Sequence, residues 1–254
     1  MMTEDYLGKI TTYSVEVRRV LISRHFHSMF EGKIQQGPLK GFAIDDDPAW
    51  GPGDLAPKLL GLYEQEILTL IESLRSRKKV LVNLGAADGY YGVGLVATNN
   101  FARSICYESS DQGRAYLERL SAQNGVADRV QIFGTATSSF PDDLKKLGIS
   151  IDESLILCDV EGAEFDIFTD DCLRSLKGAD VIIELHDFMV KDGSKALQKM
   201  VDAARNHFNL SLIKTGFRDL SGFPELDSLN DSDRWLICSE GRIQLMAWLH
   251  LSPR

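Results

Sequence analysis

The fold is decided by the stretch Lys79-Val-Leu-Val-Asn-Leu-Gly-Ala-Ala-Asp-Gly-Tyr-Tyr-Gly-Val-Gly94. Its first part, Val80 to Val82, predicts a short buried strand, the segment from Gly85 to Gly89 predicts a tight turn, and Tyr90 to Ala97 predicts a helix. A strand, a glycine turn and a helix in this order bring backbone N–H groups and the positive end of the helix to one point above the sheet edge. The stretch therefore predicts a ligand-binding site.

Short apolar segments alternate with helix-like segments after this stretch. Such alternation indicates a mainly parallel sheet with helices on both faces, so we expect a Rossmann-like, doubly wound α/β fold with seven strands. The last two expected strands are joined by a loop without a helix, which makes the last strand antiparallel. The expected strands are 80–82, 104–107, 130–133, 155–158, 181–183, 210–213 and 235–238. The helix after strand 104–107 is expected to end at residue 124, and the helices after it are expected at 140–147, 163–173 and 194–207.

The N-terminal part has a different pattern. Residues 3–30 carry apolar residues at helical spacing and predict one or two amphipathic helices, and residues 54–76 predict another helix. Between them, residues 31–53 are rich in Gly, Pro and Asp and predict an irregular segment, either a lid or binding loop or a mobile surface loop. We expect a helical extension with a lid or loop over residues 1–56, followed by an α/β domain over residues 57–254.

Composition limits the partners and the location. The chain of 254 residues has a net charge of −9, which argues against a nucleic-acid partner. We expect no secretory signal, because the N-terminal residues are acidic and lack an apolar stretch. No run approaches the ~18 apolar residues of a membrane helix. Four cysteines without C-x-x-C spacing predict reduced thiols rather than disulfides or a zinc site. We expect a cytoplasmic protein without membrane contact, and the sequence leaves a homo-oligomer open.

The class of ligand follows from two positions. Glu108 ends the second expected strand, 23 positions after Gly85, close to the spacing at which an acid reaches ribose hydroxyls; the alternative is an exposed strand-end carboxylate. Ala87 stands where dinucleotide-binding turns have the glycine that admits a pyrophosphate. The Walker pattern with its lysine is also absent. A ligand with a ribose and an amino-acid group fits better, and S-adenosylmethionine is such a ligand.

Several motifs in order resemble one known family. Asn83 to Tyr91 resembles the first motif of class I S-adenosylmethionine-dependent methyltransferases, in particular the FkbM-like group with its Asp-x-Gly-Ala-Asn-x-Gly-Tyr-Tyr pattern. The segments 158–164 and 183–186 are similar to that group's Asp-x-Glu-Gly-Ala-Glu and Glu-x-His motifs, and 60–64 to its Gly-x-Tyr-Glu segment. The resemblance covers about residues 59–185. Asn83 and Ala87 depart from the usual acid and Asn of the group.

The resemblance implies a methyl-donor site. Gly85, Ala86, Asp88 and Gly89 are expected around the methionine end of the donor, and Glu108 on its ribose. The residues after the third strand are expected near the adenine. Packing on a helix face is an equal alternative for Tyr63, and the helix core is the expected place for Tyr90 and Tyr91. The implied donor-site residues are Tyr63, Glu64, Gly85, Ala86, Asp88, Gly89, Glu108, Ser109, Thr135 and Asp159.

Acidic residues and a histidine follow the fourth and fifth strands. In the class I topology these strands are neighbours about 5 Å apart, so Asp159, Glu161, Glu184, His186 and Asp187 should converge beside the donor's methyl group. A hydroxyl acceptor must lose a proton to a base or at a metal. We expect Asp159, Glu184 and His186 to be catalytic, with His186 as the natural base; a structural histidine is the alternative.

A metal and a helix cap are the other roles open to these acids. Asp159, Glu184 and Asp187 are oxygen ligands suited to Mg²⁺, but their separation along the chain gives no ligand-spacing signature. We therefore predict no metal, although a divalent ion stays open. Glu161 and Glu164 can instead cap the helix that follows the fourth strand, which is our interpretation for Glu164.

The sequence thus predicts an S-adenosylmethionine-dependent methyltransferase that acts on a small-molecule hydroxyl, such as a sugar or a secondary metabolite. The alternative from another class is a catalytically inactive regulatory module that binds S-adenosylmethionine or a nucleoside. A dinucleotide oxidoreductase is a more distant third. The acceptor is not predicted, because acceptor pockets come from variable segments, here 31–53 and 216–233.

Overall fold

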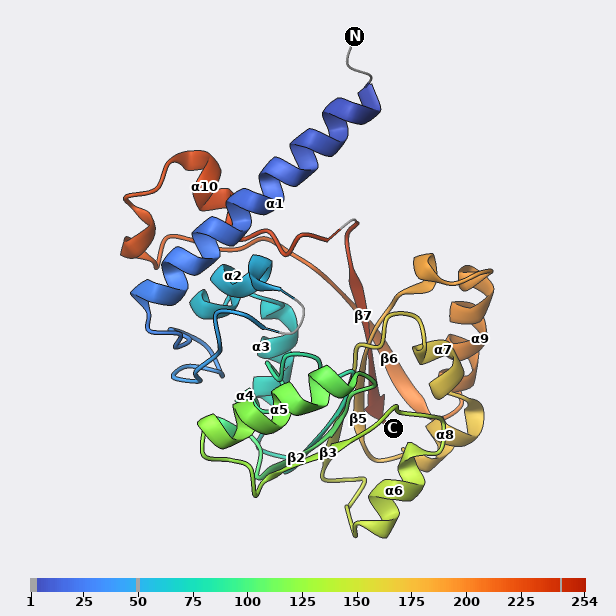
Figure 1. The fold of residues 1–254 in the computed structure, drawn as a ribbon. Coiled ribbons are helices and arrows are strands. Elements are labelled where there is room, and N and C mark those ends of the chain that lie inside the picture. The colour runs from blue at the N-terminus through green and yellow to red at the C-terminus, as the bar shows by residue number, and fades with distance from the viewer. Residues whose placement is uncertain (1–3, 49–50, 243) are drawn as a thin grey trace.

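The computed structural model describes residues 4–48, 51–242 and 244–254. Its centre is a seven-stranded sheet with the order β3-β2-β1-β4-β5-β7-β6 (Figure 1). Strands β1 to β5 are parallel, and β7 is antiparallel to both β5 and β6. The predicted mainly parallel sheet with an antiparallel last strand is therefore confirmed. The strands are β1 (Val80–Leu84), β2 (Arg103–Tyr107), β3 (Val130–Phe133), β4 (Ser154–Cys158), β5 (Asp180–Glu184), β6 (Phe208–Lys214) and β7 (Ala247–Pro253).

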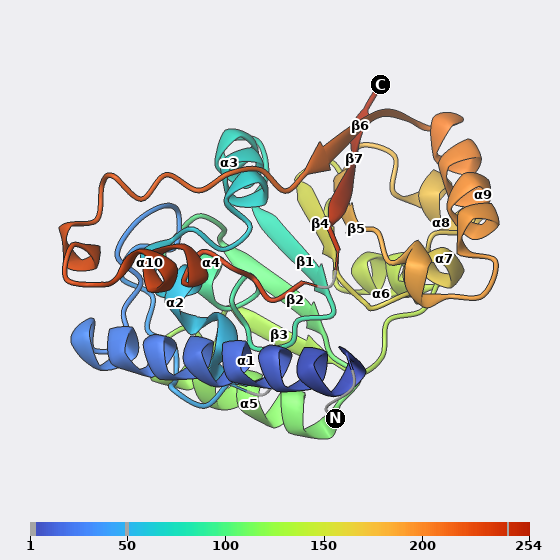
Figure 2. The same ribbon diagram turned by 90° about the horizontal axis from the view of Figure 1, so that it is seen from above.

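Helices cover both faces of the sheet, as the doubly wound prediction requires, and Figure 2 shows the two layers. The alternation of strand side chains feeds two separate hydrophobic cores: Leu81 of β1 packs in one, and Val80 and Val82 pack in the other. The first layer consists of α2 (Leu55–Leu60), α3 (Gln65–Leu74), α4 (Gly94–Ala97) and α5 (Asp111–Gln123). The second consists of α6 (Phe140–Lys146), α7 (Glu164–Ile167), α8 (Asp170–Ser175) and α9 (Gly193–Arg205).

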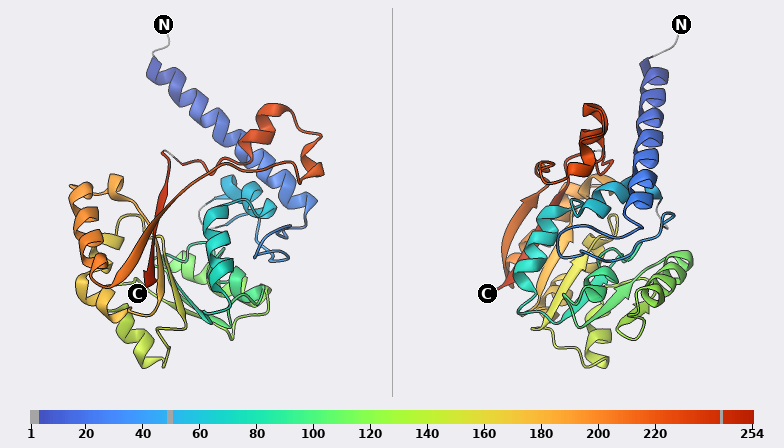
Figure 3. Two further views of the ribbon diagram at one scale, coloured as in Figure 1. Left: turned by 180° about the vertical axis from the view of Figure 1, so that it is seen from behind. Right: turned by 90° about the vertical axis from the view of Figure 1, so that its left-hand side faces the viewer.

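The N-terminal helix α1 (Glu4–Met29) runs past α2, and its N-terminal half projects from the body (Figure 3). Its C-terminal half packs into the same core as the first helical layer, through Phe26, and so does the segment around Phe42. The described part of the chain has no helix long and apolar enough to cross a membrane. The predicted division into an extension over residues 1–56 and a domain over residues 57–254 stays a prediction. Residues 1–3 and 49–50 of that extension lie outside the described residues.

The predicted helix over 54–76 is broken. A short 3-10 helix, η1 (Pro52–Asp54), leads into α2, and α3 begins only after the segment 61–64. Gly61 has a φ of 72°, and a Cβ there would lie 2.5 Å from the backbone oxygen of Gln36. The close approach of the irregular segment therefore requires glycine at this position and ends α2.

The last predicted strand is wrong in position. Residues 235–238 do not form it: α10 (Asp231–Leu236), which follows the 3-10 helix η3 (Pro224–Leu226), covers the first half of this run, and the second half is a turn. The Asn230 side chain accepts a hydrogen bond from the Asp233 backbone N–H and caps α10. Arg18 of α1 binds Asp233 and holds α10 beside α1. The antiparallel last strand is β7, which begins at Ala247.

Two other predicted helices are shorter than expected. The run 163–173 divides into α7 and α8, because the Thr169 side chain accepts a hydrogen bond from the Cys172 N–H and caps a second helix. Within 90–97, only α4 is α-helical. The remaining 3-10 helix is η2 (Asp187–Met189), which directly follows the end of β5.

Candidate active site

A cavity of about 360 Å³ lies at the carboxyl ends of β1, β2 and β4. This is the place where open α/β sheets bind ligands. Every implied donor-site residue except Gly89 lines the cavity, and so does Ala87. Lys58 and Asp54 also line it, and the sequence reasoning singled out neither of them. Gly89 instead approaches α5, since a Cβ there would lie 2.8 Å from the Leu120 side chain. Its small size therefore serves the packing of α5 under the turn.

The glycine turn closes the cavity floor. Gly85 has a φ of 77°, and a Cβ at this residue would lie 1.7 Å from the Asp159 backbone oxygen. The turn is also tied to β2, because the N–H groups of Gly85 and Ala86 donate to the Tyr107 carbonyl at 2.9 Å. Only glycine can cross the end of β4 this closely, so the turn brings the ends of β1, β2 and β4 together.

Glu108 is a fixed carboxylate at the end of β2. It is buried, and it accepts the Ala87 N–H at 3.0 Å and the Ser110 N–H at 2.8 Å, one on each carboxylate oxygen. Each oxygen has a second lone pair. Glu108 therefore lines the cavity as an oriented hydrogen-bond acceptor and is not an exposed strand-end residue. Its role on a ribose stays a prediction.

A lysine between two aspartates forms another part of the lining. The Lys58 Nζ lies 2.8 Å from an Asp54 carboxylate oxygen and also pairs with Asp88. Lys58 is buried, and its Nζ lies 4.7 Å from the centre of the Tyr63 ring and 5.5 Å from that of Tyr90. Burial alone would lower the pKa of Lys58, but the two aspartates outweigh it and raise the pKa. The site therefore carries both signs of fixed charge here.

The aromatic residues of this region have mixed roles. Tyr63 and Tyr90 line the cavity and pack edge to face at 5.5 Å between ring centres, and Tyr90 belongs to the hydrophobic core. The Tyr91 hydroxyl donates to Glu64 at 2.5 Å. Tyr90 is thus both a core residue and part of the cavity wall, and Tyr91 orients Glu64.

At the ends of β4 and β5, Asp159, Glu184 and His186 come together. Each offers one ligand atom within 4.8 Å of the others. The His186 Nε2 lies 3.7 Å from Asp159 Oδ1, 3.7 Å from Glu184 Oε2 and 3.4 Å from Glu161 Oε2. Asp159 and Glu161 line the cavity, and Glu184 and His186 are buried beside them. The expected convergence at the sheet edge is present, except that Asp187 on η2 is not part of the group.

Arg242, from the loop between α10 and β7, was not anticipated. Its Nη1 lies 2.6 Å from Glu184 Oε1 and its Nε lies 2.9 Å from Glu240 Oε2, and it also pairs with Glu64. Nothing in the sequence around Arg242 indicated this, since the residue reaches the site only because β7 pairs with β5. One guanidinium therefore serves three carboxylates.

The carboxylates of this region are hard to ionise together. Burial, followed by the charges of Asp159 and Glu64, raises the pKa of Glu184 to about 10. Burial also raises the pKa of Glu64, to about 7, against the opposing effect of Arg242, and it raises the pKa of Asp159. For His186, burial alone would lower the pKa, but Glu164, Asp159 and Glu161 outweigh it and raise the pKa. The region therefore has more negative groups than positive ones to balance them.

The predicted helix cap at Glu161 and Glu164 is wrong, because α7 begins without a side-chain cap bond. Glu164 is fully buried and accepts the N–H groups of Gly162 and His186, both at 2.8 Å. Glu161, with a side chain 67% exposed, faces His186 instead. Glu164 thus fixes the end of β5 against the turn after β4 and sets the position of the His186 backbone.

No protein-family model and no curated protein matches the sequence. Solved structures do match the fold. A precorrin-6Y C5,15-methyltransferase from Geobacter metallireducens GS-15 is similar with a TM-score of 0.52 and 14% identity, over 86% of this chain and 100% of that chain. The methyltransferase domain of METTL16 is similar with a TM-score of 0.53 and 15% identity, over 84% of this chain and 73% of that chain. At these identities the likeness shows the fold: a Rossmann-like methyltransferase fold.

Proposed function

We propose that the chain is an S-adenosylmethionine-dependent methyltransferase. The observation that carries the proposal is that one cavity combines three chemically distinct regions. A lysine between two aspartates suits an amino acid, the fixed Glu108 carboxylate suits a ribose, and the Asp159 side chain leads to a cluster of titratable groups. The methyltransferases of the same fold support this assignment.

The donor fits these regions in one direction. The adenine would lie by Ser109 and Thr135, the ribose hydroxyls on Glu108, and the methionine part along the glycine turn. Its carboxylate would pair with Lys58, the cavity-lining lysine, and its ammonium with the flanking aspartates. A nucleoside without an amino acid would leave these charges unused, which is why the donor is favoured over a simple nucleoside.

The reaction we propose is an in-line displacement. An acceptor hydroxyl oxygen forms a bond to the donor's methyl carbon, the bond from that carbon to the sulfonium sulfur breaks, and S-adenosylhomocysteine leaves with the electron pair. The hydroxyl proton passes to the group made of Asp159, Glu184 and His186. Most of the rate acceleration comes from holding the oxygen and the methyl carbon in line.

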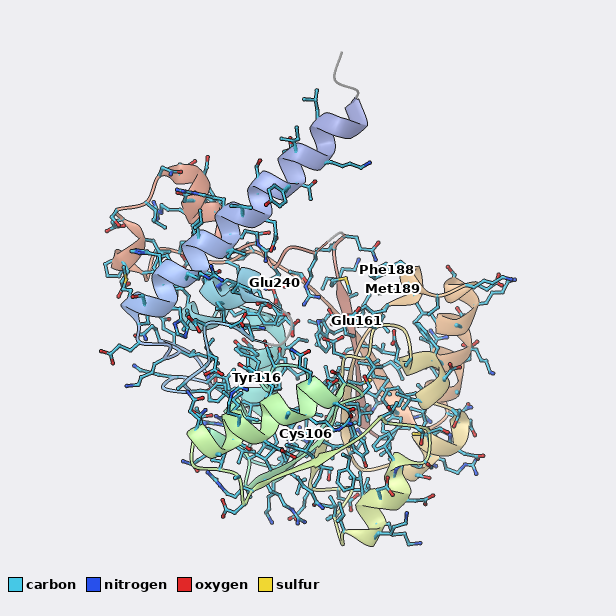
Figure 4. All side chains as sticks on the ribbon, viewed as in Figure 1. Cys106, Tyr116, Glu161, Phe188, Met189 and Glu240 are labelled. Carbon is cyan, nitrogen blue, oxygen red and sulfur yellow. The ribbon has the colours of Figure 1, made fainter. Side chains whose placement is uncertain are left out.

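The acceptor we propose is a small molecule with a hydroxyl group, as in the FkbM-like interpretation. Exposed apolar side chains lie beside the chemical end of the cavity: Phe188 is 37% and Met189 53% exposed. Figure 4 shows both side chains near Glu161, which lines the cavity. An acceptor with an apolar face would rest on Phe188 and Met189 and present its hydroxyl to Asp159.

Isothermal titration calorimetry tests the proposal. The purified protein should bind S-adenosylmethionine and S-adenosylhomocysteine with one site per chain and should not bind NAD⁺ or ATP. Absence of binding to both adenosyl compounds overturns the proposal.

Turnover distinguishes an enzyme from a regulatory module. With methyl-labelled donor and a panel of hydroxylated small molecules, the His186→Gln variant should lose transfer and keep most of its affinity for S-adenosylhomocysteine. Transfer by this variant at the unmodified rate would show that the cluster is not the chemical end of the site.

A further inference from the structure

We propose that Asp159, Glu184 and His186 bind a divalent cation at the end of the donor cavity. The chemical role of the cation rests on the proposed methyl transfer. The binding of the cation does not, because it is tested without any transfer.

The three ligand atoms have the spacing that a cation requires. Ligands held ~2.1 Å from one ion lie ~3–4 Å from one another. Asp159 Oδ1 and Glu184 Oε2 each lie 3.7 Å from His186 Nε2, and the three residues each offer one ligand atom within 4.8 Å of the other two. One nitrogen and two carboxylate oxygens suit Mn²⁺ and related divalent ions.

The residues around the ligands hold them in the required orientation. Glu164 accepts the His186 backbone N–H at 2.8 Å, and its carboxylate faces the ring Nδ1 at 3.6 Å, as in the carboxylate–histidine pairs behind protein metal sites. Arg242 binds the other oxygen of Glu184 at 2.6 Å and leaves Oε2 toward the group. Glu184 at the end of β5 and His186 two residues after it are therefore fixed by neighbours that do not compete for the ligand atoms.

Buried polar atoms at this place lack hydrogen bonds. The His186 side chain is 4% exposed, and its Nδ1, which faces Glu164 and not the ligand group, has no hydrogen-bond partner among the described residues. Asp159 Oδ1 is buried and equally without a hydrogen bond in the described chain. Polar groups in this state cost free energy unless something satisfies them. A cation would satisfy Asp159 Oδ1 and leave Nδ1 free to donate to Glu164.

The local charge also calls for a cation. Arg242 pairs with Glu64, Glu184 and Glu240, of which Glu240 also pairs with Arg218. Asp159 and Glu161 add two carboxylates whose ion-pair partner in the described chain is His186. A divalent ion provides the charge that the protein itself does not bring to this place.

The position of the ion matches the proposed reaction. Asp159 lines the cavity, so a coordination position on that side is open to the acceptor. A hydroxyl bound to a divalent cation has a lowered pKa. With the cation bound, Asp159, Glu184 and His186 would serve as ligands, so the acceptor's proton would pass to the exposed Glu161 or to water instead of to these three residues, and the oxygen would bond to the methyl carbon as the bond to the sulfonium sulfur breaks.

Electron paramagnetic resonance of Mn²⁺ tests the site directly. In titrations at fixed protein concentration, the free-Mn²⁺ signal should fall with one ion bound per chain, and Mg²⁺ should compete. The Glu184→Gln, His186→Gln and Asp159→Asn variants should each bind Mn²⁺ at least tenfold more weakly. The Glu184→Gln and His186→Gln variants should keep most of their affinity for S-adenosylhomocysteine, which serves as their folding control together with the midpoint of thermal unfolding. For Asp159→Asn, which changes a residue of the cavity lining, the midpoint of thermal unfolding is the folding control.

Asp180→Asn is the matched control, because it removes a buried carboxylate from the opposite end of the same strand and should leave Mn²⁺ binding unchanged. If the Glu184→Gln and His186→Gln variants do not fold, the test rests on Asp159→Asn alone, because Asp159 is the most exposed of the three proposed ligands. Absence of stoichiometric Mn²⁺ binding, or binding that Asp159→Asn leaves unchanged, overturns the inference. Loss of S-adenosylhomocysteine binding with Mn²⁺ binding intact would instead overturn the proposed function alone.

Discussion

Lys58 decides whether the cavity recognises an amino acid. The Lys58→Met variant keeps the length of the side chain and removes its charge. If the donor carboxylate pairs with Lys58, the variant should bind S-adenosylhomocysteine more weakly and should bind 5′-methylthioadenosine, which lacks the amino acid, as the unmodified protein does.

The size of the effect follows from the contacts. A hydrogen bond to a charged group contributes about 1.5–3 kcal/mol, which corresponds to a loss of about 10- to 150-fold in affinity for S-adenosylhomocysteine. The variant also leaves Asp54 and Asp88 without their cation. Breaking a buried ion pair costs about 3–5 kcal/mol. Asp54 and Asp88 are 24% and 13% exposed and keep some hydration, so we expect a loss of about 2–3 kcal/mol in unfolding free energy.

The assay is calorimetry with both ligands on both proteins, together with urea unfolding. Lys78→Met is the matched control: Lys78 is equally buried and pairs with Asp180 at 3.1 Å, at the amino end of the sheet away from the cavity. It should lose stability and keep the affinity ratio of the two ligands. An unchanged ratio in Lys58→Met, or an equal fall for both ligands, would refute the role of Lys58.

Three further predictions concern the turn, the ribose and the opposite edge of the sheet. Glu108→Gln should weaken S-adenosylhomocysteine and 5′-methylthioadenosine alike, by about tenfold, since both carry the ribose and lose a charge-assisted hydrogen bond; calorimetry showing an effect on only one ligand would contradict this. Gly85→Ala should abolish binding of both ligands and lower the thermal unfolding midpoint, because the new Cβ would lie 1.7 Å from a backbone oxygen; unchanged binding and midpoint would contradict the observed turn. Asp180 should contribute to acid stability: burial alone would raise its pKa, but His250 and Lys78 outweigh it and lower the pKa below 3.8. Its stabilisation is therefore present above pH 3.8 and lost as the pH falls further, so Asp180→Asn should make the acid limb of the unfolding free energy shallower, and an equally steep limb would exclude the effect.

The sheet and most of the cavity could be predicted because their signals are local. A buried strand, a glycine turn and a strand-end acid are each written within a few residues, and the parallel sheet brings strand ends to one edge. Glu108, Asp159, Glu184 and His186 therefore lie at that edge as the sequence indicated.

Other parts could not be predicted because they depend on contacts between distant segments. Lys58 is one of several polar residues on a helical stretch, and its role appears only when α2 lies over the glycine turn. Arg242 reaches Glu64 and Glu184 through the pairing of β7 with β5.

The misplaced last strand has a different cause. The run from Trp235 to Cys238 is apolar enough for a strand, but Asn230 precedes it as a helix cap, and Asp231 and Asp233 fill the first turn. These helix start signals are present in the sequence, but the strand prediction followed the apolar run and gave them too little weight. Trp235 is in fact 60% exposed, which is consistent with a surface helix.

A structure of the protein with bound S-adenosylmethionine tests the central claim most directly. We predict the ribose hydroxyls on Glu108, the methionine carboxylate at Lys58, and the sulfonium methyl facing the group made of Asp159, Glu184 and His186. A donor bound in the reverse direction, with its methyl group at Lys58 or away from Asp159, would contradict the proposed site.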